Sequence, residues 1–511
     1  MSEENQLIKE RLNKLNDIKE LGVNPYPYSF DKKNNSKELL DKYSKLQAEE
    51  KVSDKVSIAG RIMQLRKMGK ASFIHVQDEE GRLQAYLRQD DVGETAYKLF
   101  KKCDIGDFVG ITGTIFKTKT GEVSVYASNF ELLAKTTRPL PEKYHGLKDK
   151  ELRYRQRYLD LIMNSEVKNT FQKRSLMIKT IRNYFDELGF MEVETPLLQT
   201  QYGGANARPF KTHINAWDMP MYLSISPELY LKRLTVGGLE KVYTICKNFR
   251  NEGVDHSHNP EFTMCELYQA YVDYNEMMKI IENTYEKCAI ALNGDTKVKQ
   301  VIRKKGKEDE EVILDFKAPW PKKTMAELIK KYADIDVLSS SKEELISFVK
   351  DNKIDLDKKD DFYSWGDLML IIFEEFAESN LIQPTHVIDH PVESTPLCKK
   401  HRTDDRLIER FESFALGMEL CNAYSELNDP IKQKELLELQ EEKGRAGDDE
   451  HHPMDTDFIN ALEIGLPPTG GIGFGVDRMG ILLTGVESIR DIILFPTMKP
   501  VKDEKTSEDQ K

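Results

Sequence analysis

The chain has 511 residues and a mass of 59.0 kDa, which favours two or three domains over one compact core. Charged residues make up 32% of it, and no apolar run approaches the ~20 residues of a membrane-spanning helix, so we expect no membrane association. Six scattered cysteines without a CxxC pair argue against a zinc knuckle or a disulfide framework. Together with an opening segment that lacks an apolar signal core, they favour a cytoplasmic protein.

The net charge of −12 disfavours a nucleic-acid partner when it is taken alone, because phosphate binding usually needs a basic excess. The charge is unevenly distributed, however. Residues 51–150 carry 18 basic and 13 acidic side chains, whereas residues 151–511 carry 48 and 64. A basic module is therefore joined to an acidic one, and local charge leaves RNA open as a partner.

The first 135 residues predict a helical segment followed by a small β-barrel. Within residues 1–50, apolar side chains at three- and four-residue steps predict an amphipathic helix over residues 5–21, for which packing and RNA contact are equally compatible roles. Residues 51–135 contain five strand-like runs separated by turns, with a helix expected over residues 94–102. This is the outline of an OB-fold, whose open face binds single-stranded nucleic acid, although strand count alone equally allows another small barrel.

The polar, proline-containing segment 136–150 predicts a linker to a second domain, residues 151–500. This domain opens with a long helix expected over residues 167–188, ended by a glycine. A strand that runs to Pro196 should follow it.

An insertion is expected at about residues 293–380. It begins with a charged stretch, most simply a solvent-exposed hairpin, and continues as helices in which we recognise no chemistry. Residues 501–511 should form a disordered tail.

The segment 241–271 predicts an antiparallel hairpin whose loop carries Arg250, Glu252 and His258. Because side chains two apart on a strand share a face, Arg250 should point with Glu252. One face of the returning strand carries four side chains, namely Phe262, Met264, Glu266 and Tyr268. Charged groups on a half-buried face need a ligand, and a guanidinium beside an aromatic ring suits a nucleotide. A surface hairpin with ion pairs is the alternative.

The segment 468–485 predicts a strand that leads into a helix at Arg478. Gly471, Gly473 and Gly475 alternate with apolar residues, so that one strand face has no side chains. Such a floor indicates close approach of a ligand or of another backbone, with Arg478 as a cation at its edge. A bulged structural strand is the alternative.

Residues 409–429 bring several polar side chains together. Asn422, Tyr424 and Glu426 share a strand face, and Glu412 and Glu419 add two carboxylates. Carboxylates beside a nucleotide suit Mg²⁺, which takes one or two protein oxygens together with phosphates. Simple alternation does not align Glu419 with Glu426, so a bulge or turn is required if both face one pocket. Each acid taken alone is better explained as a solvent-exposed surface side chain.

Residues 225–234 predict a helix that starts at Ser226-Pro227, with Glu228 in its first turn. The helix dipole favours a carboxylate at that place. Taken by itself, this pattern indicates only a structural helix cap.

Together these segments resemble the catalytic core of the class II aminoacyl-tRNA synthetases, and most closely the lysyl-tRNA synthetases. The long helix with its strand ending at Pro196 resembles motif 1, FRNE…HNPEF resembles motif 2, and GGIGFGVDRM resembles motif 3. QYGGANARPF, SPELYLKRL, HNPEFTMCELYQAY and NAYSELNDP are similar to the lysine-specific subgroup. The resemblance covers about residues 5–500.

The resemblance implies an α+β protein with an N-terminal OB-fold β-barrel for the anticodon and a class II catalytic domain, an antiparallel sheet with flanking helices. It implies a homodimer that activates L-lysine with ATP and Mg²⁺ and transfers the lysyl group to the 3′ end of tRNA(Lys). Catalysis of this kind is mostly positioning and charge stabilisation.

The resemblance also implies an ATP site with two catalytic arginines. Arg250 would hold the α-phosphate and the lysine carboxylate. Arg478 and Phe262 would sandwich the adenine, and Arg478 with His258 would steady the γ-phosphate. The remaining residues of this site are Glu252, which would read the adenine amino group, and the Mg²⁺ carboxylates Glu412 and Glu419.

For the amino acid, Glu228 and the Gly204 backbone would bind the α-ammonium. Three side chains would enclose the ε-ammonium, namely Glu266, Tyr268 and Glu426, beside Asn422 and Tyr424. A partly desolvated cation needs carboxylate partners, whereas an aspartate-specific site would need cations instead. The pocket therefore favours lysine.

In the barrel, the resemblance implies that an anticodon base stacks on Phe73 and bonds Gln84, with Glu131 as a further base contact. Without the resemblance, Phe73 would be taken as ordinary barrel core. Two rival functions stay open, an asparaginyl or aspartyl enzyme of the same class and an inactive relative that only binds RNA through its barrel.

Overall fold

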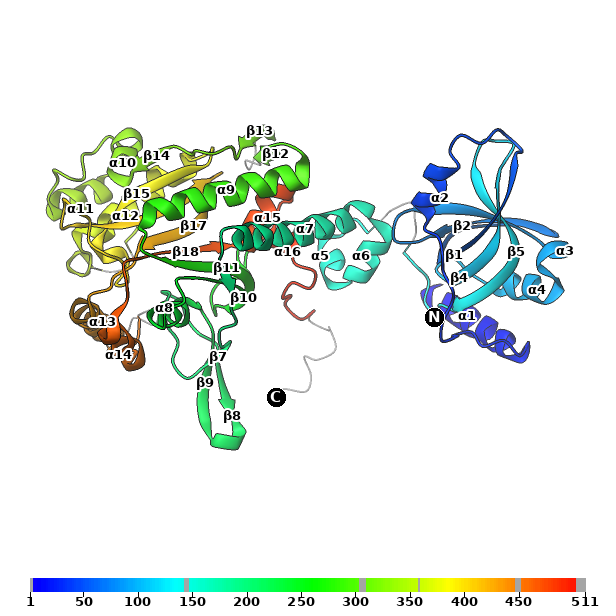
Figure 1. Ribbon diagram of the computed structural model, residues 1–511, viewed down its shortest axis with the longest axis horizontal. Helices are drawn as coiled ribbons and strands as arrows, with labels where there is room; N and C mark the ends of the chain where they lie inside the picture. The colour runs from blue at the N-terminus through cyan, green and yellow to red at the C-terminus, as the bar shows by residue number, and fades with distance from the viewer. Residues whose placement is uncertain (1–2, 142–146, 303–308, 357–358, 446–451, 502–511) are drawn as a thin grey trace. The chain divides into compact units, whose positions relative to one another are not determined.

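The computed structural model describes residues 3–141, 147–302, 309–356, 359–445 and 452–501. The chain divides into two compact units, residues 1–148 and 149–511 (Figure 1). The tail predicted at the C-terminus lies outside the described residues from 502 onward. No helix in the described part of the chain is long and apolar enough to cross a membrane.

The first unit contains a closed five-stranded barrel with the order β1-β2-β3-β5-β4. Its strands are β1 (Lys51–Met68), β2 (Ala71–Gln77), β3 (Arg82–Arg88), β4 (Phe108–Lys117) and β5 (Val123–Ala134). All pairs are antiparallel except β3 with β5. Alternate apolar side chains such as Ile58, Ile74 and Ile111 fill the interior. The predicted OB-fold is confirmed.

Four helices accompany the barrel, namely α1 (Glu3–Glu20), α2 (Ser36–Lys42), α3 (Gln89–Val92) and α4 (Glu94–Lys102). The helix α4 has the bounds that the sequence predicts. In α1, Ile18 is buried in the barrel core, and Lys14 Nζ lies 2.5 Å from Asp104 Oδ1. These contacts make α1 a packing helix of this unit.

The second unit is built on an eight-stranded sheet with the order β14-β15-β16-β17-β18-β11-β10-β6. Its strands are β6 (Met191–Glu192), β10 (Lys241–Phe249), β11 (Glu261–Ala270), β14 (Lys322–Thr324), β15 (Thr385–Pro391), β16 (Leu407–Ala415), β17 (Met418–Ser425) and β18 (Thr469–Gly475). Only the two edge pairs, β14 with β15 and β10 with β6, are parallel. The predicted antiparallel sheet is confirmed, although the strand expected up to Pro196 is reduced to the two residues of β6.

Three helices cover one face of this sheet, namely α7 (Ser165–Glu187), α9 (Tyr274–Asn293) and α15 (Val476–Thr484). Figure 1 shows α7 and α9 side by side, and both contribute to the largest apolar core. Because successive strand side chains point to opposite faces, Cys265 and Leu267 of β11 join this core. Met264, Glu266 and Tyr268 point to the other face, where they line a cavity.

The remaining strands form two small sheets, β12 (Lys297–Ile302) with β13 (Glu310–Asp315), and β7 (Leu198–Gln199), β9 (Met219–Leu223) and β8 (Lys211–Ile214) in the order β7-β9-β8. The β12–β13 pair lies where the sequence predicts a charged hairpin.

The remaining α-helices are α5 (Lys150–Arg155), α6 (Arg157–Met163), α8 (Glu228–Val236), α10 (Met325–Ala333), α11 (Lys342–Asp351), α12 (Trp365–Phe376), α13 (Pro430–Arg445), α14 (Thr456–Gly465) and α16 (Ile489–Ile492). Short 3-10 turns occur at Asn215–Trp217, Asp360–Phe362, Glu378–Asn380 and Val392–Ser394. Helices α10, α11 and α12 share a core that includes Val387 and Phe414 of the main sheet. Because β14 also belongs to that sheet, part of the region expected to be an insertion packs against the main sheet of the second unit.

Candidate active site

A cavity of about 340 Å³ lies on the sheet face that α7, α9 and α15 leave open. Side chains of β11, β17 and β18 and of the loops around them form its walls. It is lined by every site residue predicted for this unit, namely Gly204, Glu228, Arg250, Glu252, His258, Phe262, Glu266, Tyr268, Glu412, Glu419, Asn422, Tyr424, Glu426 and Arg478.

The floor of the cavity is the glycine strand β18, which lies between β11 and β17. Gly471 is the register partner of Tyr268 on one side and of Tyr424 on the other. A Cβ at Gly471 would lie 2.1 Å from Glu426 Oε1, and one at Gly473 would lie 2.8 Å from the Met264 methyl. The floor without side chains that the sequence predicts is confirmed. Glycine is needed there because side chains of the neighbouring strands β11 and β17 lie directly over β18.

A β-bulge in β17 brings its carboxylates into one cavity. Ser413 of β16 pairs with Cys421, but the next residue, Phe414, pairs with Glu419. Leu420 is therefore the extra residue of the bulge. The side chains that precede it on β17 point to the opposite face from the one that simple alternation would give them. Glu419 and Glu426 consequently line the same cavity. The bulge that the sequence analysis required for this arrangement is present.

The predicted hairpin is present, but the alternation argument for Arg250 was wrong. Strand β10 ends at Phe249, so Arg250 and Glu252 belong to a loop held by backbone bonds such as Arg250 N to Pro260 O at 3.0 Å. Both residues still line the cavity. The Arg250 guanidinium lies 5.2 Å from the centre of the Phe262 ring, burial lowers its pKa, and its buried Nε has no hydrogen-bond partner in the described part of the chain.

One end of the cavity holds Arg478. Its Nη1 donates to the backbone oxygen and to Oε2 of Glu419, both at 3.0 Å, and its Nη2 lies 3.4 Å from Nε2 of His258. Burial raises the pKa of Glu419, but the Arg478 guanidinium outweighs it and lowers that pKa below the usual value. Burial raises the pKa of Glu412 to about 7, and the negative charge of Glu419 adds to this effect.

These two carboxylates fit a divalent cation bound together with phosphates, since each raises the cost of ionising the other until a cation is present. No group of three or more acidic, His or Cys side chains that could hold a metal ion occurs among the residues that the structure describes. Glu412 and Glu419 line the cavity as two carboxylates, a number typical of magnesium held partly by substrate.

The other end of the cavity holds three buried carboxylates, Glu228, Glu266 and Glu426. Glu266 accepts from Ser226 Oγ at 2.8 Å and from the Tyr268 hydroxyl at 3.2 Å. Burial raises the pKa of Glu266 and of Glu426 to about 8, and the charge of Glu228 adds to the increase for both. Glu426 Oε1 has no hydrogen-bond partner among the described residues. Such an end is suited to a ligand that donates hydrogen bonds and carries positive charge.

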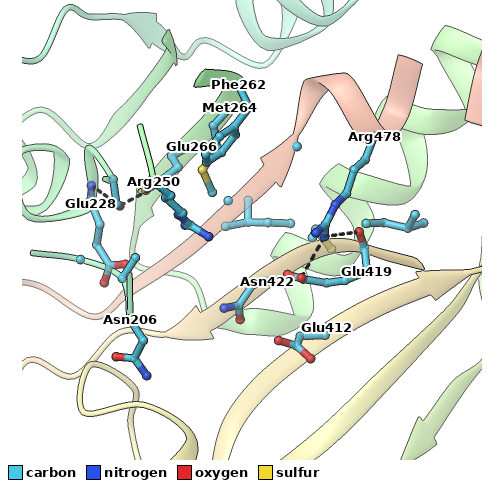
Figure 2. A pocket seen from close by; sticks show the side chains of 18 of the residues that line it. Asn206, Glu228, Arg250, Phe262, Met264, Glu266, Glu412, Glu419, Asn422 and Arg478 are labelled. Carbon is cyan, nitrogen blue, oxygen red and sulfur yellow. Dashed lines mark hydrogen bonds and ion pairs between the residues drawn. The ribbon is translucent and has the colours of Figure 1, made fainter. Parts of the chain in front are cut away.

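Arg250 lies between these two ends (Figure 2). Glu228 is on one side of it, and the Arg478–Glu419 pair is on the other. A cation in this position can contact an anionic group of each of two ligands that meet in the middle of the cavity.

Sequence reasoning missed two cations of this site, the half-buried Arg410 and the fully buried Lys232. Arg410 Nε donates to Asn422 Oδ1 at 3.0 Å, and its Nη2 bonds Glu412. Lys232 Nζ lies 2.5 Å from an oxygen of both Glu228 and Glu426. Spacing alone could have indicated both, since Arg410 is two residues from Glu412 on a strand and Lys232 is four from Glu228 on a helix.

The barrel carries a second candidate site on its outer face. Phe73 is half-buried beside Tyr86, with ring centres 4.6 Å apart, and Tyr86 contacts Tyr126. Its neighbours Ser72 and Ile74 point into the barrel, so the interpretation of Phe73 as ordinary core is wrong. Aromatic rings on an open barrel face suit the stacking of nucleic-acid bases.

The polar side chains of this face differ in part from the prediction. Gln84 donates to Glu122 Oε2 at 2.6 Å and accepts from Ser124 Oγ at 2.9 Å. Glu131 lies seven residues beyond Ser124 on β5, about 23 Å at ~3.3 Å per residue, and accepts from Asn129 instead. The structure therefore groups Phe73 and Gln84 with Glu122 and leaves Glu131 apart.

Comparison with known proteins agrees with this arrangement of sites. Residues 149–499 match the family model of the tRNA synthetases class II (D, K and N), and residues 56–133 match that of an OB-fold nucleic acid binding domain. The chain is 52% identical over 503 residues to a lysine–tRNA ligase of Clostridium novyi, which covers 98% of this chain and 96% of that protein. Lysine–tRNA ligases of Clostridium tetani and Pelotomaculum thermopropionicum are 51% and 50% identical over 97% of this chain and 96% and 95% of theirs. The chain therefore belongs to the class II tRNA synthetases (D, K and N), and within them to the lysine–tRNA ligase family.

Proposed function

We propose that this protein is a lysine–tRNA ligase that activates L-lysine with ATP to lysyl-adenylate and pyrophosphate, and then transfers the lysyl group to the 3′ end of tRNA(Lys). The observation that carries the proposal is the carboxylate end of the cavity, where Glu426 Oε1 is buried and none of the residues that the structure describes donates a hydrogen bond to it. Lysine brings two ammonium groups to Glu228, Glu266 and Glu426. Aspartate would bring a second carboxylate there and asparagine a neutral amide, so neither compensates these charges.

Activation requires the lysine carboxylate to attack the α-phosphate of ATP while the bond to pyrophosphate breaks. The position of Arg250 between the two ends supports its role as the cation that holds both reacting groups. Negative charge grows on the α-phosphate oxygens during the attack, and a guanidinium already in place stabilises it.

The remaining ATP contacts lie at the Arg478 end. Adenine stacks between Phe262 and Arg478, with Glu252 as the acceptor for its amino group, and His258 assists Arg478 at the γ-phosphate. Glu412 and Glu419 hold Mg²⁺, which when bound would neutralise phosphate charge. Arg410 keeps Glu412 in place through the hydrogen bond between them.

Lysine binds at the opposite end. Glu228 and the backbone of Gly204 take its α-ammonium, and Gly204 suits this role because its positive φ of 83° brings the backbone against Glu228, where a Cβ would lie 2.9 Å from the Glu228 Cβ. Glu266, Tyr268 and Glu426 enclose the ε-ammonium. Asn422 and Tyr424, which bond each other at 2.9 Å, form the wall between the ends.

The barrel, residues 51–135, reads the anticodon. Phe73 provides the stacking surface, and Gln84 and Glu122 provide hydrogen bonds to base edges. We name Glu122 in place of Glu131 because Gln84 contacts it directly.

The protein acts as a homodimer in the cytoplasm. Apolar side chains of α7 and of the segment after it are exposed, namely Leu176, Met191 and Leu198 at 43%, 54% and 49%, and a second copy would cover them. All six cysteines are free, which is consistent with a reducing compartment. Light scattering should give twice the chain mass, and a monomer would contradict the dimer.

The test of the activity is ATP–pyrophosphate exchange with a panel of amino acids in the presence of Mg²⁺. Lysine should stimulate exchange, and aspartate and asparagine should leave it at background. Exchange driven by either of them would show that the specificity is misassigned. No exchange with any amino acid, together with retained tRNA binding, would favour the protein that only binds RNA.

A further inference from the structure

Lys232 is a buried lysine of the protein that contacts two carboxylates of the proposed lysine pocket. It lies one helical turn after Glu228 in α8, and none of its side chain is exposed. Its Nζ is 2.5 Å from Glu228 Oε1 and 2.5 Å from Glu426 Oε2. The rings of Tyr268 and Phe458 lie 6.0 and 5.9 Å from the same atom.

Lys232 therefore joins two carboxylates with different proposed tasks. Glu228 belongs to the α-ammonium end of the bound amino acid, and Glu426 belongs to the ε-ammonium end. A buried ammonium is tolerated only with such partners, and the ion pairs hold the pKa of Lys232 above its usual value despite burial. The cation is thus permanent at neutral pH, and it restrains both carboxylates.

The charges around the pocket show what this cation does. Glu228, Glu266 and Glu426 are three carboxylates, and Lys232 compensates one of them. When lysine is bound and its ammonium groups favour the ionised form of all three carboxylates, two negative charges remain for those two ammonium groups. Other titratable or charged groups near this cluster include Tyr268, Tyr424, Cys246, Cys398, Arg250, Arg410 and His452.

We infer that Lys232 is a positioning residue for lysine selection, which holds Glu228 and Glu426 at a set separation so that they receive the two ammonium groups of the substrate. The inference rests on the proposed lysine pocket. Lys232 itself touches neither ATP nor the reacting atoms.

The chain offers a matched control in Lys135 of the barrel unit. Its side chain is also fully buried, and its Nζ lies 2.8 Å from Asp104 Oδ2 and 3.1 Å from Asp107 Oδ2. It lines neither candidate site. Lys135→Met should therefore cost stability, as loss of a buried ion pair does, without changing the response to lysine.

Lys232→Met keeps the length of the side chain and removes its charge. We expect the KM for lysine in ATP–pyrophosphate exchange to rise about 10- to 150-fold, the range for losing a hydrogen bond to a charged group, while the KM for ATP stays within about twofold. The lysine deficit should narrow as the pH is raised from 7 to 9, because Glu426 without its cation ionises only at higher pH. Lys135→Met should show neither change.

A double-mutant cycle with Glu426→Gln tests whether Lys232 acts through the carboxylate. Lys232→Met should cost at least about fivefold less lysine affinity in the Glu426→Gln background than in the wild type. If Lys232→Met does not fold, Lys232→Gln, which retains hydrogen-bond donors without charge, replaces it in the same cycle with the same expected direction.

Equal losses of lysine and ATP affinity, a lysine deficit that does not depend on pH, or an additive cycle would each overturn the inference and leave Lys232 with a structural role. Wild-type protein that shows no binding of lysine by calorimetry would instead overturn the proposed function. The two failures are therefore distinguishable.

Discussion

Individual residues of the cavity differ in whether they have partners. Arg478, Glu419 and Glu412 are already paired in the structure, whereas Arg250 Nε and Glu426 Oε1 are buried without a partner among the described residues. A buried polar atom without a partner costs free energy, and a ligand that satisfies it recovers that cost on binding. Arg250 and Glu426 are therefore the residues at which substitution should affect ligand binding most directly.

Glu426→Gln should weaken lysine binding far more than ATP binding. The substitution keeps the shape of the side chain but removes a carboxylate from the ε-ammonium end, and a hydrogen bond to a charged group contributes about 1.5–3 kcal/mol, or roughly 10- to 150-fold. Calorimetric titration with lysine and separately with ATP measures both affinities. A similar loss of lysine affinity and ATP affinity would mean that Glu426 does not belong to the ε-ammonium site.

At the scale of elements, the cavity depends on a strand whose cavity-facing positions are glycines. Strand β18 allows β11 and β17 to point Tyr268, Glu266 and Glu426 over it, because its glycines leave room for them. The bulge in β17 adds the second requirement, because it brings Glu419 to the same side as Glu426. The glycines of β18 and the bulge in β17 therefore act by placing the side chains of other residues in the cavity.

Gly471→Ala should therefore abolish most lysine binding. The new methyl group would lie 2.1 Å from Glu426 Oε1 and 2.4 Å from Tyr268 Cε1, so both side chains must move. The comparison variant is Gly475→Ala on the same strand, whose methyl group would meet nothing closer than 3.6 Å. We expect lysine KM to rise at least about tenfold in the first and to stay within about twofold in the second. Equal behaviour of the two variants would refute the role assigned to the floor.

The barrel face allows a similar comparison. Phe73→Ala should lower kcat/KM for tRNA charging by about 5- to 150-fold, the range for losing a stacked base, and leave ATP–pyrophosphate exchange unchanged, because activation takes place in the other unit. Tyr28→Ala, which removes a fully exposed aromatic ring of the same unit, is the control and should change neither activity. Loss of exchange in Phe73→Ala would contradict the separation of tasks between the units.

At the scale of the whole molecule, folding, protonation and lysine binding are linked. Burial raises the pKa of Glu266 and Glu426 to about 8 in the free protein, so between about pH 4.5 and 8 the folded state holds protons that the unfolded chain has lost. Stability from these two groups is therefore lost as the pH rises through this window. Bound lysine reverses the effect, because its ammonium groups favour the ionised carboxylates.

The increase in Tm caused by a fixed, subsaturating concentration of lysine should accordingly grow from pH 6 to pH 8. Calorimetry at pH 7 in buffers of different ionisation enthalpy should show that protons are released on binding. In Glu426→Gln the release should fall by up to one proton. A lysine affinity that is flat across this range would show that both carboxylates are already ionised in the free protein.

Much of the fold was predictable from the sequence because short-range patterns of side chains indicate it. The five barrel strands, the helix Glu94–Lys102 and the glycine strand follow from period-two alternation and from turn residues, which act over a few positions. The short strand β6 and the joining of β14 to the main sheet were not predictable, because such edges are defined by pairing partners far along the chain.

For the sites, the sequence by itself determined which side chains are available and that a bulge was needed to align Glu419 with Glu426. Only the tertiary structure decided that Glu122 contacts Gln84, and that Lys232 and Arg410 pair with the carboxylates of the cavity. The physical reason is burial. The sequence identifies a charged side chain but not its surroundings. Its pKa, its partner and its role depend on which other charged groups the fold buries beside it.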